Sequence, residues 1–213
     1  GGLERVYEFS RNFRNEGIDR THNPEFTLLE IYQAYADYAD MMCLAEEMLS
    51  SVAESATGST KVSYQGQEID LMPPWRRVSL YDAVEEHAGI SLRGEDEGGL
   101  RRICEKLHVE VEPGSNRGQL IDEIFDATAQ PHLIQPTFIT DYPLEMSPLA
   151  KRHREDPELT ERFEPFVMGW EIGNSFSELN DPIDQRERFE DQMRLREGGD
   201  EEAQVLDEDF IRA

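Results

Sequence analysis

The sequence predicts an α+β fold, with strand-like segments towards the two ends of the chain and a mainly helical insertion between them. Apolar and polar residues alternate through 3–14 and 25–37, and Gly17 and Pro24 allow an antiparallel connection between these two stretches. Helical spacing of apolar residues dominates the middle of the chain. With 38% hydrophobic residues, the 213-residue chain can bury a sizeable core.

The first helix is expected to begin after Asp40, a residue type that caps helix N-termini, because apolar residues recur at helical spacing from Met41 to Val52. A small hairpin that turns at Gln65–Gly66 should follow. Three further amphipathic helices are expected at 79–87, 100–107 and 119–129.

Strand-like sequence returns at 136–143 and between Phe163 and Leu179. Asp181, followed by a proline at the first helical position, predicts the start of the last helix, and Gly198–Gly199 predicts its end. We therefore divide the chain into three parts: a hairpin with its following helix, an insertion, and the remaining strands with the last helix, at 1–59, 60–132 and 133–213.

A formal net charge of −25 argues against broad binding of nucleic-acid phosphates by this chain. A magnesium-bridged nucleotide is compatible with the charge, because carboxylates recruit the metal and arginines bind the phosphates. The basic run Lys151–Arg154 is interpreted as a solvated loop. No apolar run approaches the roughly 18 residues that span a bilayer, so we expect no membrane partner.

The stretch "EIGNSFSEL" contains residues suited to binding a cation. Asn174, Phe176 and Glu178 alternate and should point the same way from an extended chain, whereas Glu171 points the opposite way unless a bulge at Gly173 intervenes. Two convergent carboxylates beside an amide could bind Mg²⁺ or a substrate ammonium group. The alternative is a set of surface carboxylates on an edge strand.

The opening hairpin offers a complementary set of groups. Arg14 and Glu16 share a strand face, and an arginine fork can bind a phosphate through two hydrogen bonds. Phe26 could stack on a base, and Glu30 and Tyr32 lie on one face of the second strand. The alternative is an ordinary surface hairpin with Arg–Glu pairs.

These residues lie in stretches that resemble a known family. "GLERVYEFSRNFRNEGIDRTHNPEFTLLEIYQAYADY" is similar to motif 2 of the class II aminoacyl-tRNA synthetases, in its lysyl-tRNA synthetase version. "HLIQPTFITDYPLEMSPLAK", "ERFEPFVMGWEIGNSFSELNDPIDQRERFEDQ" and "GDEEAQVLDEDF" resemble the same enzyme, while 60–132 resembles it only loosely. The resemblance implies an antiparallel sheet that is flanked by helices and carries the ATP and lysine sites.

The resemblance also implies roles for individual residues. Arg14 would be catalytic, since it would hold the α-phosphate of ATP. The residues implied in ATP binding are Arg14, Glu16, His22, Asn23 and Phe26. Those implied in lysine binding are Glu30, Tyr32, Asn174, Phe176 and Glu178, and the Mg²⁺ ligands would be Glu171 and Glu178.

The implied enzyme is a lysine–tRNA ligase, which uses ATP, L-lysine, Mg²⁺ and tRNA(Lys) in the cytoplasm. Motif 1, which forms the dimer interface in this family, would precede Gly1, and motif 3 would follow Ala213. We therefore expect the chain to be part of a longer homodimeric enzyme and to be poorly active by itself; whether it dimerises alone stays open.

Two alternatives remain at this point. One is the shorter synthetase-like ligase that attaches lysine to a translation factor, and the other is a non-catalytic module that keeps the fold for interaction. An aspartyl or asparaginyl relative is disfavoured, because a pocket for an acidic side chain should offer a cation where Glu30 and Glu178 stand.

Overall fold

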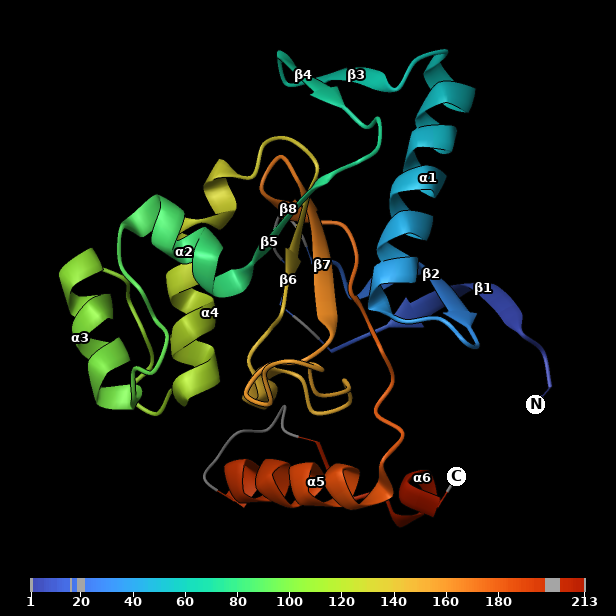
Figure 1. Cartoon of the computed structure of the whole chain (residues 1–213). Helices are drawn as coiled ribbons and strands as arrows, with labels where there is room; N and C mark the ends of the chain where they lie inside the picture. The colour runs from blue at the N-terminus through green and yellow to red at the C-terminus, as the bar shows by residue number, and fades with distance from the viewer. Residues whose placement is uncertain (1, 16, 19–21, 198–203, 213) are drawn as a thin grey trace. The chain divides into compact units, whose positions relative to one another are not determined.

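We describe the protein from a computed structural model, in which residues 2–15, 17–18, 22–197 and 204–212 are described. The chain divides into two compact units, Gly1–Ala36 and Asp37–Ala213. Figure 1 labels the helices and strands of the chain. No helix within the described ranges is both long and apolar enough to cross a membrane.

The first unit is a two-stranded antiparallel hairpin. Its strands are β1 (Arg5–Phe13) and β2 (Glu25–Gln33), and they pair over their whole length. The backbone N–H of Arg14 donates to the Pro24 carbonyl at 2.9 Å, which extends the ladder beyond the last strand pair. The predicted antiparallel pairing of these two segments is confirmed.

The second unit is built on a five-stranded sheet in the order β5-β6-β7-β8, with β9 also paired to β7. The bounds are β5 Arg76–Ser79, β6 Thr137–Thr140, β7 Arg162–Val167, β8 Trp170–Glu171 and β9 Ser175–Phe176. The strands β6 to β9 pair antiparallel, as expected, but β5 pairs parallel to β6. The α+β class is confirmed, and the sheet is mixed because a long helical connection separates β5 from β6.

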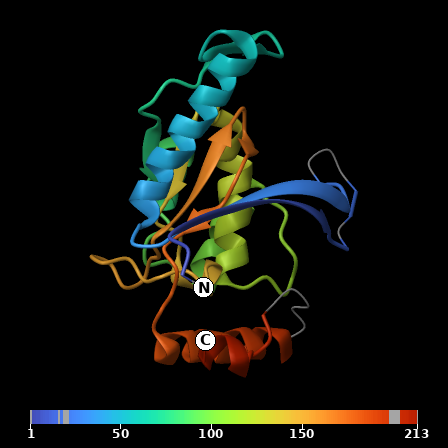
Figure 2. The same ribbon diagram turned by 90° about the vertical axis from the view of Figure 1, so that its right-hand side faces the viewer.

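Helices pack on both faces of this sheet. On one face Phe138 of β6 and Phe163 of β7 pack with Met42 of α1 (Tyr38–Thr57). On the other face Ile139 and Phe166 join a larger core with α2 (Leu80–Ala88) and α4 (Arg117–Thr128). Figure 2 shows this layering, with the blue α1 in front of the sheet and the yellow-green α4 behind it.

A capping box starts α1 three residues earlier than the sequence predicts. The Asp37 carboxylate accepts from the Asp40 N–H at 3.3 Å, and the Asp40 carboxylate accepts from the Asp37 N–H at 3.0 Å. Asp37 is therefore the N-cap, and the prediction of Asp40 as the cap is wrong by one helical turn. The helix ends at Thr57, where Gly58 adopts φ +79.

The middle of the chain contains the predicted hairpin and three helices. Their bounds are β3 Lys61–Tyr64, β4 Gln67–Asp70, α2 Leu80–Ala88, α3 Glu97–Leu107 and α4 Arg117–Thr128, followed by the 3₁₀ turn η1, Gln130–His132. Ser79 caps α2 through the Asp82 N–H, as in a standard N-cap. The middle region also supplies β5 to the sheet, so it contributes to the main core; its treatment as a separate insertion stays a prediction.

A 3₁₀ turn η2 (Leu144–Met146) follows β6. The chain ends in helices α5 (Pro182–Glu197) and α6 (Glu208–Arg212). The Asp181 carboxylate accepts from the Ile183 N–H at 2.9 Å, which confirms the predicted start of α5 with proline in its first turn. The predicted end at Gly198–Gly199 lies outside the described residues.

Candidate functional site

The hairpin presents four of the predicted ligand-binding residues on one face. Phe26, Glu30 and Tyr32 alternate along β2, and Arg14 continues β1 in the matching phase. The Arg14 guanidinium lies over the Phe26 ring, 5.2 Å from its centroid, which is a cation–π contact. The Tyr32 hydroxyl lies 3.5 Å from a carboxylate oxygen of Glu30.

The segment between the two strands carries the other predicted nucleotide residues. His22 and Asn23 lie just before β2, in a stretch without regular secondary structure, and Glu16 lies outside the described residues. Sequence reasoning overlooked Glu8, which the register places directly opposite Glu30. The alternation of β1 could have identified it, since Glu8 has the same phase as Arg14.

In the second unit, a bulge aligns the residues of the "EIGNSFSEL" stretch. Phe166 of β7 faces Glu171, whereas Phe163 faces Ser175, so the three residues 172–174 lie opposite the two residues 164–165. The extra residue brings Glu171 into phase with Phe176. The bulge that the sequence allowed at Gly173 is therefore present, and Glu171 lies on the same sheet face as Phe176.

Negative charge is concentrated around Glu171. Burial and the charge of Glu164 raise the pKa of Glu171 to about 7, although part of the residue remains exposed. Burial and Glu164 also raise the pKa of Asp122 on α4 to about 6. One turn further along α4, burial and the charge of Asp122 raise the pKa of Asp126 to about 7. Such a group of carboxylates favours the approach of a cation.

Arg162 organises this region, although sequence reasoning did not single it out. Its Nε donates to the Asn174 side-chain oxygen at 3.1 Å, and its guanidinium pairs with Glu164 and lies over the Tyr142 ring, 4.5 Å from the centroid. Because the amide oxygen of Asn174 is engaged, its NH₂ group is the part available to a ligand. That donor suits a carboxylate or phosphate oxygen better than an ammonium group.

Glu178 lies beyond β9 and forms an isolated bridge with Ala150. Burial raises the pKa of its carboxyl group. Phe176, two residues earlier, is half-buried in β9. Among the residues that the structure describes, no three His, Cys, Asp or Glu side chains form a metal-binding group.

The basic run is a largely exposed loop, as predicted, but two of its arginines are paired with carboxylates. Arg152 donates to both carboxylate oxygens of Asp184, at 2.9 and 3.0 Å. Arg154 pairs with Glu161 and with Asp37, each at 2.7 Å. Both arginines therefore tie the loop to other elements of the second unit, and neither is reserved for nucleic acid.

The family model described as tRNA synthetases class II (D, K and N) matches residues 1–213. The chain belongs to this family. The predicted class II resemblance is thereby confirmed over the whole chain, including the middle region that resembles it less closely.

Three individual relatives of this class II synthetase chain are lysine–tRNA ligases. The chain is 57% identical to a lysine–tRNA ligase of Moorella thermoacetica over 217 residues, which cover 100% of the chain and 44% of that protein. It is 57% identical to one of Porphyromonas gingivalis, covering 37% of it, and 54% identical to one of Pelotomaculum thermopropionicum, covering 43%. The chain thus spans less than half the length of these relatives.

Proposed function

We propose that this class II synthetase chain is the ATP- and lysine-binding part of a lysine–tRNA ligase. The observation that carries the proposal is the identity of 53–57% to lysine–tRNA ligases along the entire chain. All residues that the family resemblance implies in ligand binding are present in the sequence. The proposal therefore concerns a longer protein, whose transfer step uses tRNA.

The hairpin would bind the nucleotide. Arg14 would hold the α-phosphate, because a guanidinium can donate two parallel hydrogen bonds to phosphate oxygens. Phe26 would stack on adenine, and since Arg14 lies over this ring at 5.2 Å, the base would have to take the place of that contact or use the opposite face. Glu16, His22 and Asn23 would contact the rest of the nucleotide.

Lysine selection would rest on carboxylates. Glu178 in the second unit and Glu30 with Tyr32 in the hairpin are suited to a substrate ammonium, and Phe176 to its aliphatic stem. A neutral analogue would leave a partly buried carboxylate unpaired, which is the basis of strong discrimination. The NH₂ group of Asn174 would donate to the amino-acid carboxylate.

Glu171 and Glu178 fit the requirements of a Mg²⁺ ion. They offer hard oxygen donors, and Glu171 lies among carboxylates whose mutual repulsion a cation would relieve. The lack of a three-residue cluster among the described side chains is compatible with this assignment, because Mg²⁺ usually uses one or two carboxylates, water and substrate phosphates. Bound there, Mg²⁺ would neutralise charge on the phosphates of ATP.

The reaction would require little proton transfer from the protein. The lysine carboxylate attacks the α-phosphorus of ATP in line, the bond to the β-phosphate bridging oxygen breaks, and lysyl-adenylate and pyrophosphate form. The tRNA ribose hydroxyl then takes the lysyl group and AMP leaves. Catalysis would rest on the alignment of both substrates and on the Arg14 charge at the α-phosphate.

Lysine-dependent ATP–pyrophosphate exchange by the full-length protein tests this proposal. Exchange should require lysine and should not occur with aspartate or asparagine. Labelled lysine should pass to tRNA; transfer to a protein acceptor would instead support the translation-factor ligase. A folded protein without any exchange would favour the non-catalytic module.

A variant of Glu178 makes the test specific to this site. Glu178→Gln should lower kcat/KM for lysine by about 100-fold, because the ammonium loses its charged partner. The matched control is Glu158→Gln, a change at an exposed carboxylate of the neighbouring loop, which should leave kcat/KM within about twofold. Equal effects of the two changes would contradict the role of Glu178.

A further inference from the structure

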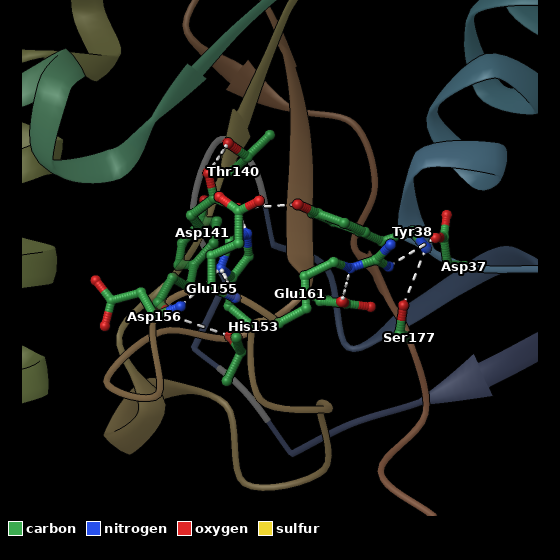
Figure 3. A network of polar contacts seen from close by, with 12 residues as sticks. Asp37, Tyr38, Thr140, Asp141, His153, Glu155, Asp156, Glu161 and Ser177 are labelled. Atoms are coloured by element: carbon green, nitrogen blue, oxygen red, sulfur yellow. Dashed lines mark hydrogen bonds and ion pairs between the residues drawn. The ribbon is translucent and has the colours of Figure 1, made fainter.

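The peptide unit at Ser177 is held on several sides. Its N–H donates to the Glu161 carbonyl at 2.9 Å, and its carbonyl accepts from the Lys151 N–H at 2.8 Å. Its side-chain oxygen accepts from the Tyr38 N–H at 3.0 Å, at the start of α1. Figure 3 shows Ser177 beside Tyr38, Asp37 and Glu161. Ser177 lies between Phe176 and Glu178 in sequence, so these contacts fix the segment that carries both.

One cation connects the acidic groups around this segment. The Arg154 Nε donates to Glu161 at 2.7 Å, and its Nη2 donates to Asp37 at 2.7 Å. Burial tends to raise the pKa of Glu161, but hydrogen bonds from Arg154 and the Ser177 side chain outweigh it and lower that pKa. The hydrogen bond from Arg154 likewise lowers the pKa of Asp37.

Arg154 and Glu161 are buried to different extents, and this difference determines which of them depends more on the ion pair. Arg154 keeps 58% of its side chain exposed, whereas only 4% of the Glu161 side chain is exposed. An exposed ion pair contributes little to stability, but a buried carboxylate that loses its cation must be resolvated or move. Loss of Arg154 would therefore displace the Glu161 side chain, and with it the hydrogen bond between that side chain and the side chain of Ser177.

We infer that Arg154 is a positioning residue for substrate binding, which acts through Glu161 and Ser177 on the segment from Phe176 to Glu178. The inference rests on the proposed function, because it assigns to Arg154 the alignment of the carboxylate that binds the substrate ammonium. Among the described residues, the polar partners of the Arg154 side chain are Asp37 and Glu161, and Arg154 is not among the residues implied in ATP binding.

The test measures KM for lysine and KM for ATP separately, by pyrophosphate exchange in the full-length protein. Arg154→Ala should raise KM for lysine about tenfold, since a displaced ligand of the ammonium binds it poorly. KM for ATP should rise by a smaller factor, because the implied ATP-binding residues of the hairpin are not part of this segment and Glu171 would still hold the Mg²⁺ ion. Arg154→Lys keeps the positive charge but not the planar guanidinium group, so it should recover part of the lysine affinity that Arg154→Ala loses.

Further variants keep the inference falsifiable. Arg194→Ala, which removes an exposed arginine paired with Asp191 on α5, is the matched control and should change neither KM. Ser177→Ala should raise KM for lysine in the same direction, and the Arg154→Ala/Ser177→Ala double variant should show less than the product of the two effects. If Arg154→Ala fails to fold, Ser177→Ala decides by the same two KM values.

The outcomes separate this inference from the proposed function. An unchanged KM for lysine, or equal rises in both KM values, would overturn the positioning role and leave the function standing. A wild-type protein without lysine-dependent exchange would overturn the function and, with it, the inference.

Discussion

Asp184 should stabilise the second unit in a pH-dependent way. It lies on α5 and accepts two hydrogen bonds from Arg152, at 2.9 and 3.0 Å, and two from Arg188, at 3.1 and 3.0 Å. Arg188 also donates to the carbonyls of Ser147 and Ala150. Substitution of Asp184 by Asn removes the charge that both arginines share.

The magnitude follows from the pKa of this carboxyl. Burial tends to raise it, but the hydrogen bonds from Arg188 and Arg152 outweigh burial and lower the pKa from 3.8 to about 2. A shift of this size corresponds to about 2 kcal/mol of stability. Because the folded pKa is depressed, this stability is present above the unfolded pKa and is lost as pH falls through the folded value. It should be nearly complete at pH 5 and reduced to roughly half at pH 3.

Urea unfolding at pH 7, 5 and 3, followed by tryptophan fluorescence, measures this contribution. Asp184→Asn should lower the free energy of unfolding by about 2–4 kcal/mol at pH 7, because it also leaves Arg188 buried without its carboxylate. The control is Asp191→Asn on the same helix, whose pair with Arg194 is exposed and should contribute less than about 0.5 kcal/mol. A loss for Asp184→Asn that is equal at pH 7 and pH 3, or no larger than the control, would refute this reasoning.

Two further changes test the packing and the helix ends of the second unit. Phe125→Ala should cost about 3–5 kcal/mol in urea unfolding, because Phe125 is 2% exposed and packs against Phe166; a loss below about 1 kcal/mol would contradict its place in the core. Gly58→Ala should lower the free energy of unfolding by about 1 kcal/mol, since φ is +79 and no atom lies within 4 Å of the new Cβ, so only backbone strain acts. An unchanged thermal midpoint for Gly58→Ala would show that α1 ends differently.

Local sequence signals predicted the local structure well. The turn at Gln65–Gly66, the cap at Ser79 and the proline start of α5 depend on residues within a few positions of each other, and the structure contains all three. The bulge at Gly173 was predictable for the same reason. Asp40 was misassigned because Asp37 and Asp40 are both good caps, and only the reciprocal bonds of the capping box separate them.

Long-range contacts were not predictable from the sequence. The parallel pairing of β5 with β6 joins segments separated by α2, α3 and α4. Arg154 meets Asp37 across 117 positions, so the basic run gave no sign that its charges were already paired. Arg162 was missed for a similar reason, since its role depends on Asn174 returning beside it after the turn.

The position of β6 determines when its backbone amides become exposed to solvent. Thr137–Thr140 is buried at every position, is hydrogen-bonded to β5 on one side and β7 on the other, and lies between two packed layers of helices. Its amide hydrogens can therefore exchange with water only when the second unit unfolds as a whole. Deuterium uptake at this strand would report the global free energy of unfolding, while the hairpin β1–β2, a separate compact unit, would report its own opening.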